Sequence, residues 1–359
     1  SYPTFNLNDP RKLTGMYTDE EIKDMSDEEY RNNLYSLWTN YCVSESYEPG
    51  STFKPVTVAS ALEEGVVKDG DTYVCKGFET VADYKLKCHV FSTIGSHGSL
   101  TVEQALMNSC NPYMIHLALE MGNSRFAYYQ SLFGFGKITG IDLPGETTGI
   151  VYGDRMTTID AACNSFGQTI NVNMMQMMAA YCSIINGGML YQPHIVKRIE
   201  SANGEVVKEY KANLVRQTIT ASTSKLLRRY LKNTVEEGTA KKAGVTGYSV
   251  AGKTGTAQKG DRKDNKWIIS FIGHAPAENP KFAIYVVIDE PYGTTGTSGS
   301  SADVLTLTHN ILEKLLPYMN VYKDASDEYE DTSSSPDELT VDGLSLIHIS
   351  EPTRQAEIS

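Results

Sequence analysis

The sequence contains no uninterrupted apolar run long enough to span a bilayer, and no signal peptide opens it. It also has no excess of basic residues. The 32 Lys and Arg residues stand against 44 Asp and Glu, and the net charge of −12 argues against a nucleic-acid-binding protein. Hydrophobic residues make up 40% of the 359 residues, which is typical of a globular protein and excludes a largely disordered one. This length is enough for one large domain or two modest ones.

The ends of the chain differ from its body. An initiator Met is absent before SYPTFNLNDP, so we expect a fragment with an upstream anchor missing. Eight acids and no base lie between residues 324 and 342, and we interpret 324–345 as an acidic, Ser-rich linker. Residues 346–359 do not match the composition before them, and we interpret them as a non-native tail. Residues 1–323 remain as one nearly neutral domain.

None of the six cysteines lies in a CxxC pair or at a spacing typical of zinc sites. Cys75 and Cys88 flank a short segment and could pair outside the cell; the alternative, which we favour, is that all six are buried thiols. His97 could suggest a metal ligand or a general base, but the other histidines give no ligand spacing, which favours a loop-ordering role. We therefore predict no metal and no cofactor.

The hydrophobic pattern predicts helices in the first part of the chain and an antiparallel hairpin late in it. The expected helices cover 26–41, 48–65, 101–122, 157–187 with an interruption at Gly167, and 303–317 up to Pro317. Ser26 and Glu29 have the spacing of a capping box at the start of the first helix, and Gly65 closes the second. A hairpin around Asn203-Gly204 is expected at 196–210, and strands are expected at 248–258, 267–276 and 281–291. This order predicts an α+β fold.

Ser51 and Lys54 are a candidate nucleophile and base, because they are separated by one helical turn and therefore lie on one face. A lysine acts as a base toward a serine only if burial or nearby positive charge lowers its pKa. The preceding Pro49-Gly50 turn would put Ser51 at a helix N-terminus, where free backbone N–H groups can stabilise an oxyanion. The same pattern recurs at Ser222–Lys225, where an N-cap role fits better, so this motif alone is weak.

Two further motifs follow along the chain. Ser109 and Asn111 lie two residues apart before Pro112, which suggests a helix break with both side chains facing one cleft. A helix cap is the alternative, and Ser201–Asn203 repeats the pattern in the predicted hairpin turn. The segment Lys253–Thr256 (KTGT) occurs once. In a strand, the lysine cation and the threonine hydroxyls would lie beside Gly255, which leaves the backbone uncovered. This arrangement suits a substrate carboxylate and a peptide that binds alongside the strand.

In this order the three motifs form the S-x-x-K, S-x-N, K-T-G triple of the penicilloyl-serine transferases. Longer segments, among them YEPGSTFKP (47–55), SFGQTI (165–170) and GYSVAGKTGTAQK (247–259), resemble the transpeptidase domain of class B penicillin-binding proteins over roughly residues 1–320. The resemblance implies a β-lactamase/transpeptidase-like fold, in which an antiparallel sheet is flanked by helices and joined to an all-helical subdomain. It also implies that the first two strands of the sheet precede residue 1. The strand at 281–291 would then be an exposed edge, and we expect the chain to fold poorly.

The resemblance also implies roles for the motif residues. Ser51 would attack the penultimate D-Ala of a peptidoglycan stem peptide, with Lys54 as base. Ser109 would relay the proton, Asn111 would hold the substrate backbone and the amine, and Lys253 would set the electrostatics around Ser109. The implied carboxylate site is formed by the hydroxyls of Thr254 and Thr256 beside Gly255. β-Lactams would acylate Ser51.

The implied partners are stem peptides ending in D-Ala-D-Ala, β-lactams, and a wall-synthesis complex that includes a glycosyltransferase. The implied location is the outer face of the cell membrane, reached through an N-terminal anchor, and no nucleic acid is involved. Three alternatives stay open: a D,D-carboxypeptidase that uses water as acceptor, a β-lactam sensor or β-lactamase, and a binding protein without turnover. The Asp289-Glu290 pair is interpreted as a strand end rather than as a catalytic acid pair.

Overall fold

The computed structural model describes residues 5–13, 17–260, 266–291 and 300–325. The predicted tail (346–359) and all of the predicted linker beyond residue 325 lie outside these ranges. The longer helices are α1 (Asp19–Asp24), α2 (Asp27–Trp38), α4 (Lys54–Glu64), α5 (Val102–Met107), α6 (Asn111–Met121), α7 (Asn123–Leu132), α8 (Thr158–Asn164), α9 (Met174–Ile185), α10 (Ala221–Glu236) and α11 (Ala302–Tyr318). The shorter ones are α3 (Tyr41–Ser44) and the 3-10 helices η1 (Gly50–Phe53), η2 (Gly153–Arg155) and η3 (Lys241–Ala243).

The strands form one central sheet and several small ones. β9 (Ala251–Lys259), β10 (Lys266–Ala275) and β11 (Phe282–Asp289) form an antiparallel sheet in the order β11-β10-β9. The small two-stranded sheets pair β1 (Thr72–Cys75) with β4 (Gly98–Thr101), β2 (Phe78–Val81) with β3 (Tyr84–Lys87), β5 (Met189–Gln192) with β8 (Asn213–Gln217), and β6 (Arg198–Glu200) with β7 (Val206–Glu209). The predicted α+β class is confirmed, and β1–β4 and β2–β3 lie beside the helical part.

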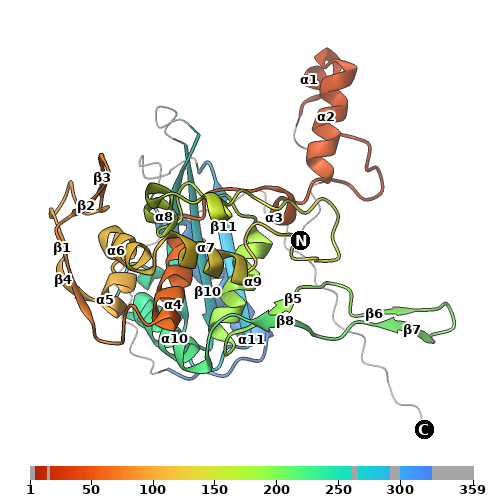
Figure 1. The fold of residues 1–359 in the computed structure, drawn as a ribbon. Coiled ribbons are helices and arrows are strands. Elements are labelled where there is room, and N and C mark those ends of the chain that lie inside the picture. Colours follow the sequence, from red (N-terminus) through yellow and green to blue (C-terminus); the bar gives the residue numbers. More distant parts are fainter. Residues whose placement is uncertain (1–4, 14–16, 261–265, 292–299, 326–359) are drawn as a thin grey trace, which may run out of the picture.

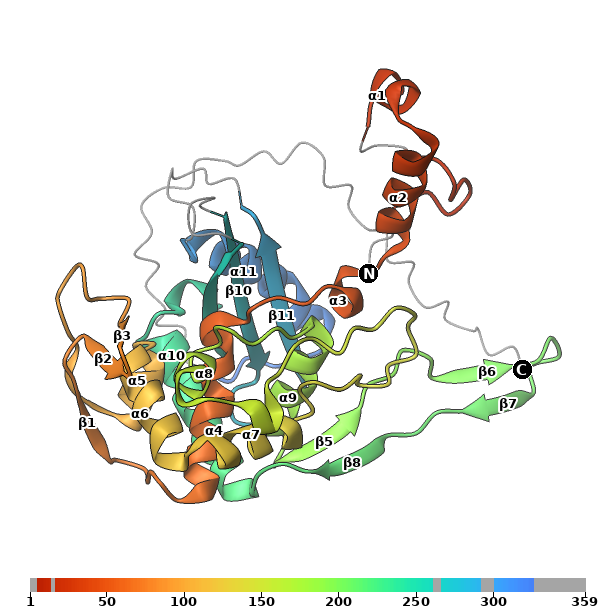
Figure 2. The ribbon, with the colours of Figure 1, turned by 45° about the horizontal axis from the view of Figure 1, so that its top comes forward.

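Helices cover both faces of the central sheet (Figures 1 and 2). On one face α11 packs its apolar stripe, including Val304 and Leu312, against Ile269 and Phe271 of β10. On the other face α4 lies at the centre of a larger core that also takes in α6, α9 and α10, and Ile272 of β10 joins that core. Side chains that alternate along β10 therefore reach opposite cores, as expected for a strand covered on both sides.

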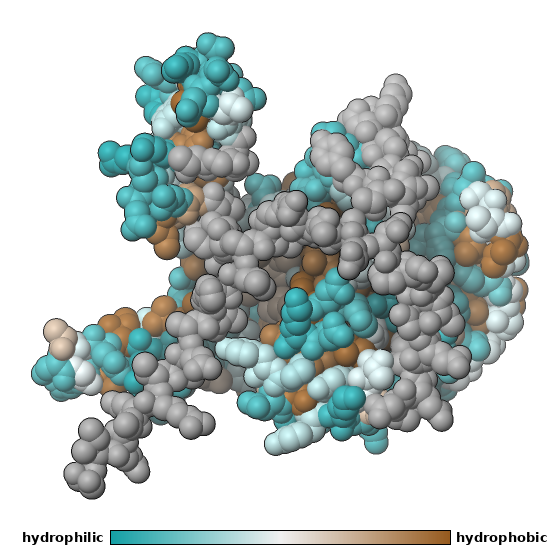
Figure 3. Space-filling model, turned by 180° about the vertical axis from the view of Figure 1, so that it is seen from behind, coloured by the Kyte–Doolittle hydropathy of each residue, from teal (hydrophilic) through white to brown (hydrophobic). Residues whose placement is uncertain are grey.

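Two arms extend from this body (Figure 1). One consists of α1 and α2, each of which begins at a capping box, and it packs on a small core of its own around Leu13, Leu34 and Leu37. The other is the β6–β7 hairpin, whose turn lies at Asn203-Gly204 as predicted. From behind, apolar side chains follow this arm (Figure 3), and Val206 and Val207 are exposed on it.

Several predicted boundaries need correction. The segment 101–122 is not one helix, because Ser109 has φ +56° and separates α5 from α6. Pro317 does not stop the last helix, which continues to Tyr318. Asp324, the first acid of the predicted linker, accepts a 2.7 Å hydrogen bond from the Ser249 backbone and so packs against the body. Within the described residues β11 is an edge of the central sheet, as expected for 281–291.

Candidate active site

Ser51 lies in η1, the short helix that leads directly into α4. Gly50 precedes it with φ +56°, a left-handed conformation that favours glycine, and Pro55 lies in the first turn of α4. A Cβ on Gly50 would lie 2.6 Å from the backbone oxygen of Thr256, so the chain around Ser51 and the strand β9 can approach this closely only with glycine here. The predicted placement of Ser51 at the start of a helix is confirmed.

Lys54 begins α4 and is completely buried. Its Nζ lies 2.6 Å from the Ser109 carbonyl oxygen, 2.7 Å from Asn111 Oδ1 and 2.9 Å from Ser109 Oγ. Burial removes the ammonium group from water and lowers the pKa of Lys54 to about 8. A neutral amine has two N–H groups and one lone pair. Two of the three contacts are carbonyl oxygens that only accept, and the third is a hydroxyl that can donate, so this environment matches the neutral amine.

Ser109 connects the lysine to the candidate nucleophile. Its Oγ lies 3.0 Å from Ser51 Oγ as well as 2.9 Å from Lys54 Nζ. Hydroxyl hydrogens rotate freely, so the same three atoms can carry a proton from Ser51 to Ser109 and from Ser109 to the amine. We expected the Ser51 hydroxyl to lie within proton-transfer reach of the Lys54 amine; the hydrogen bonds that connect the two side chains run through Ser109.

The turn that carries Ser109 and Asn111 is held in a strained shape. A non-glycine residue at φ +56° costs on the order of 1–3 kcal/mol, and such residues persist only where their surroundings hold them. The bond from the Lys54 amine to the Ser109 carbonyl provides one such restraint. A second is the bond that Asn111 Nδ2 donates to the Lys87 carbonyl at 3.3 Å. The predicted helix break is confirmed, and both side chains point to one place, the Lys54 amine.

The Lys253–Thr256 segment forms the part of β9 that packs against η1. Lys253 is completely buried, and its Nζ donates to the carbonyl and hydroxyl oxygens of Thr254 at 3.2 and 3.3 Å. Burial, followed by the charge of Lys54, lowers the pKa of Lys253 well below its ordinary value. A Cβ on Gly255 would lie 2.8 Å from a Thr52 methyl carbon and 2.9 Å from the Pro49 carbonyl oxygen. The prediction that Gly255 permits close approach is confirmed, and the neighbour is the chain around Ser51.

All eight predicted site residues therefore come from three elements that meet at one place: η1–α4, the α5–α6 turn and β9. The second copies of the S-x-x-K and S-x-N motifs lie elsewhere. Ser222 is in the first turn of α10, whose N-cap is Thr220 rather than Ser222. Ser201 lies in the β6–β7 turn. Asp289 ends β11 and pairs with Lys259 at 2.9 Å, which agrees with its interpretation as a strand end.

Sequence reasoning did not find the role of Gly167. This residue, with φ +80°, accepts a 2.9 Å hydrogen bond from Gly50 N, and a Cβ on it would lie 2.0 Å from the Gly50 oxygen. Gly167 therefore packs against the turn before Ser51 and holds it through this hydrogen bond. The glycine inside the SFGQTI segment was the available signal.

Sequence reasoning also missed a cluster beside the site. Cys75, Cys88, His97 and Cys110 have no familiar spacing, yet their ligand atoms all lie within 4.8 Å of one another. The six cysteines are thiols in the structure, so Cys75 and Cys88 do not pair; of the six, Cys42, Cys163 and Cys182 are only half-buried. The available signal was that Cys75, Cys88 and His97 precede the Ser109–Asn111 motif within one stretch of sequence and that Cys110 lies inside it.

A family model described as the penicillin-binding protein transpeptidase domain matches residues 17–313. The chain belongs to this family. Stage V sporulation protein D of Bacillus subtilis is 41% identical over 288 residues, which cover 79% of this chain and 44% of that protein. The peptidoglycan D,D-transpeptidase FtsI of Escherichia coli K12 is 32% identical over 292 residues, which cover 80% of this chain and 46% of that protein. The chain thus spans a little under half the length of these curated relatives.

Solved structures of transpeptidases share the fold. Penicillin-binding protein 3 of Mycobacterium tuberculosis in complex with aztreonam matches with a TM-score of 0.72 at 28% identity, covering 81% of this chain and 66% of that one. The same protein in complex with ampicillin matches with a TM-score of 0.73 at 28% identity, with the same coverage. The expected transpeptidase-like fold is confirmed by these matches. In the described residues of this family member, no helix is long and apolar enough to cross a membrane.

Proposed function

We propose that this chain is the catalytic domain of a peptidoglycan D,D-transpeptidase that works through a serine acyl-enzyme and is acylated by β-lactams. The observation that carries the proposal is the chain of hydrogen bonds from Lys54 Nζ through Ser109 Oγ to Ser51 Oγ. It joins a buried amine of lowered pKa to a hydroxyl at a helix start, which is the arrangement that activates a serine nucleophile.

In the first step Ser51 Oγ attacks the carbonyl carbon of the penultimate D-Ala, and its proton passes through Ser109 to the Lys54 amine. The tetrahedral oxyanion is stabilised by backbone N–H groups of Ser51 and Thr256, whose segments lie in contact. When the tetrahedral species collapses, the C–N bond breaks, and Ser109 returns the proton to the leaving D-Ala nitrogen. The product is an ester between Ser51 and the shortened stem peptide.

In the second step an amino group of a neighbouring stem attacks this ester. The same path removes a proton from the attacking nitrogen and returns one to Ser51 Oγ, so a peptide cross-link forms and the enzyme is regenerated. The hydroxyls of Thr254 and Thr256 hold the terminal carboxylate of the donor, and Asn111 holds its backbone. Lys253 sets the electrostatic field around Ser109. These residues act as positioning groups for the donor strand along the edge of β9.

The substrates are stem peptides ending in D-Ala-D-Ala, and the domain acts on the outer face of the cell membrane, where these peptides are. Its partners are the other members of a wall-synthesis complex, including a glycosyltransferase. The closest alternative is a D,D-carboxypeptidase, which transfers the acyl group to water. A β-lactamase or sensor differs in the lifetime of its penicilloyl ester, and a binding protein without turnover differs in releasing no D-Ala.

The test is labelling with a fluorescent penicillin. We expect a covalent adduct on the wild-type chain that persists for hours, and its complete loss in Ser51→Ala. Ser222→Ala is the matched control, because Ser222 belongs to the second S-x-x-K motif, away from the site. Labelling that survives in Ser51→Ala would refute the proposal. Release of D-Ala that depends on an added amine acceptor separates the transpeptidase from the carboxypeptidase.

A further inference from the structure

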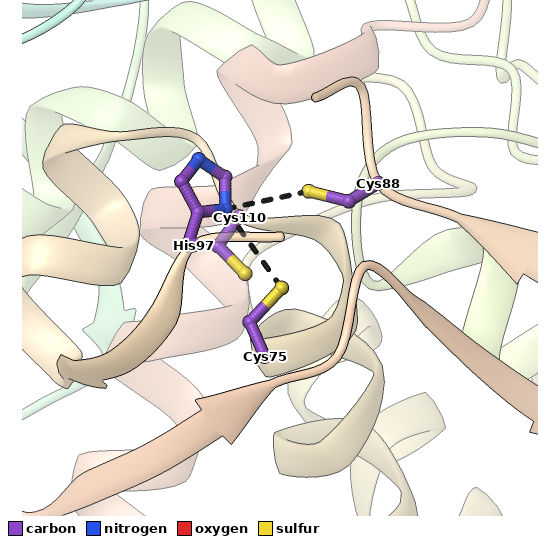
Figure 4. Close-up of side chains that lie close together, drawn as sticks. All are labelled: Cys75, Cys88, His97 and Cys110. Carbon is purple, nitrogen blue, oxygen red and sulfur yellow. Dashed lines mark hydrogen bonds between the residues drawn. The ribbon is translucent and has the colours of Figure 1, made fainter. Parts of the chain in front are cut away.

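Three cysteines and one histidine converge beside the candidate active site (Figure 4). Cys75 ends β1, Cys88 follows β3, His97 precedes β4 and Cys110 lies between Ser109 and Asn111. The three cysteines are buried and the histidine is half-buried. The catalytic steps proposed above use none of these four side chains, so the cluster requires its own explanation.

The distances in the cluster match a tetrahedral metal site. His97 Nδ1 lies 3.8 Å from Cys75 Sγ and 3.6 Å from Cys88 Sγ, and all four ligand atoms lie within 4.8 Å of one another. Zinc is bound tetrahedrally at about 2.3 Å from sulfur and about 2.0–2.1 Å from nitrogen, so ligand atoms around it are roughly 3.5–3.8 Å apart. No separation exceeds 4.8 Å, which is only about 1 Å beyond this range, so a small contraction of the cluster would allow all four atoms to bind one ion.

The backbone around the cluster is shaped for this convergence. Gly77 N donates to Cys75 Sγ at 3.4 Å, a contact that stabilises a thiolate, and Cys88 N donates to the Gly77 carbonyl at 2.8 Å. Gly77 has φ +87°, and a Cβ there would lie 2.0 Å from the Gly95 oxygen. The turn after Cys75 can therefore approach the loop before His97 only with glycine at position 77.

A disulfide or simple apolar packing would account for only part of the cluster. A disulfide would use two sulfurs and leave a third thiol and an imidazole beside it. Apolar packing of thiols does not call for an imidazole nitrogen directed at two of them. Cys110 is also the N-cap of α6, a position that favours Ser, Thr, Asp or Asn, and its side chain makes no capping bond there.

We propose that Cys75, Cys88, His97 and Cys110 bind one Zn²⁺ in a tetrahedral Cys₃His site. The three sulfurs bind as thiolates, and their protons are released to solvent as the ion binds. Four protein ligands leave no open coordination position, so the ion is structural and takes no part in the acyl transfer.

The ion would fix the turn that carries two of the candidate catalytic side chains. Cys110 separates Ser109 from Asn111, and Asn111 Nδ2 donates to the carbonyl of Lys87, the neighbour of Cys88. Ligation of Cys88 and Cys110 by one ion therefore restrains both ends of that hydrogen bond. The zinc site itself does not depend on the proposed transpeptidase activity, because its metal content is measured without a substrate.

The first experiment is metal analysis of the full 359-residue chain, purified under reducing conditions without added metal. We expect one zinc per chain, and at least a tenfold lower content in Cys88→Ser and in Cys110→Ser. Cys42→Ser and Cys182→Ser are matched controls that keep the zinc, since both cysteines lie outside the cluster. His97→Cys is the variant for the case in which the serine variants do not fold, and we expect it to retain one ion.

Substitution with Co²⁺ tests the ligand set directly. We expect the intense visible absorption of tetrahedral Co²⁺ with a strong sulfur-to-metal charge-transfer band, and a shift of the visible bands in His97→Cys as a fourth sulfur replaces nitrogen. Weak octahedral absorption would overturn the proposal. So would a soluble wild-type chain that contains no metal, or one in which Cys75 and Cys88 are joined by a disulfide.

The second experiment tests the link to the site. Removal of the zinc by a chelator under reducing conditions is expected to lower the rate of fluorescent-penicillin labelling by about tenfold or more, and added Zn²⁺ to restore it. An unchanged rate in the metal-free chain would overturn the positioning role. If the zinc-loaded chain is not labelled at all, the proposed function fails while the measured zinc content still decides the metal site.

Discussion

Lys54 Nζ lies 2.9 Å from Ser109 Oγ, although 55 residues separate the two in sequence. The contact is buried, and Ser109 Oγ continues it to Ser51 Oγ at 3.0 Å. Proton transfer between hydrogen-bonded groups requires heavy-atom separations of about 2.6–3.2 Å, and both steps of this path meet that condition. The proposed chemistry therefore depends on Ser109 as much as on the lysine.

Replacement of Ser109 by Ala should interrupt this path. We expect the second-order rate of acylation by a fluorescent penicillin to fall by about 10²–10⁴-fold, the usual contribution of a positioned proton carrier. The final labelling site should remain Ser51, as peptide mass mapping can check. Ser201→Ala removes the first residue of the second Ser-x-Asn motif, in the β6–β7 turn, and should leave the rate of acylation unchanged. A Ser109→Ala variant that labels at the wild-type rate would contradict the relay.

The rate of acylation should depend on pH through Lys54. A protonated ammonium cannot accept the serine proton, so the rate should rise about tenfold per pH unit below the pKa and level off above a pH of about 8. Stopped-flow labelling across a pH range that brackets this pKa checks the profile. Lys225→Ala, in the second S-x-x-K motif, should keep the same profile. A rate that falls as pH rises toward 8 would exclude the lysine as the base.

Asn111→Asp should move this profile. Asn111 Oδ1 lies 2.7 Å from Lys54 Nζ, and a carboxylate at that distance stabilises the ammonium form. An opposite charge this close raises the pKa of a lysine by about 1–3 units, so the plateau should shift to higher pH by that amount. Asn111→Ala removes the contact without adding a charge and should not shift the plateau upward. Identical profiles for the two variants would contradict this account of Lys54.

Gly167→Ala should disrupt the site by a steric clash. The new Cβ would lie 2.0 Å from the Gly50 oxygen, and backbone on both sides leaves no flexible side chain to move away. We expect acylation to fall by more than about tenfold, because a displacement of about 1 Å at a reacting group already costs about 10²-fold. Gly65→Ala is the matched control. Gly65 has φ +76° at the end of α4 but nothing within 4 Å of its Cβ position, so this variant should lose only the cost of the left-handed conformation, about 1–2 kcal/mol of stability, read from its thermal melt. Equal losses of acylation in both variants would show that the positive φ, rather than the clash, is responsible.

Much of the local structure was predictable from sequence because its causes are local. The capping box of Ser26 and Glu29 opens α2, Gly65 ends α4 in a left-handed conformation, and Asn203-Gly204 turns the β6–β7 hairpin. The apolar runs late in the chain predicted the strands of the central sheet to within a few residues. Short-range signals of this kind do not depend on where the rest of the chain lies.

The errors occur where a distant contact decides the local conformation. A helical pattern runs through 101–122, yet the bond from Lys54 to the Ser109 carbonyl helps to hold a left-handed residue in the middle of it. The sequence marked Gly167 as a simple interruption, whereas its function is to admit the Gly50 carbonyl. The cysteine spacing gave no sign of the cluster of Cys75, Cys88, His97 and Cys110, because side chains that come from four different segments show no short motif.

The chemical groups of this protein can be read from its sequence: a serine one turn from a lysine, a Ser-x-Asn pair, a Lys-Thr-Gly-Thr strand and their order along the chain. Folding determines which copies of these motifs meet, places Ser109 between the amine and the nucleophile, and brings four side chains from distant positions together. Periodicity and capping act over a few residues. Burial of Lys54 and the close approaches at Gly50, Gly77 and Gly167 arise only when distant segments pack together.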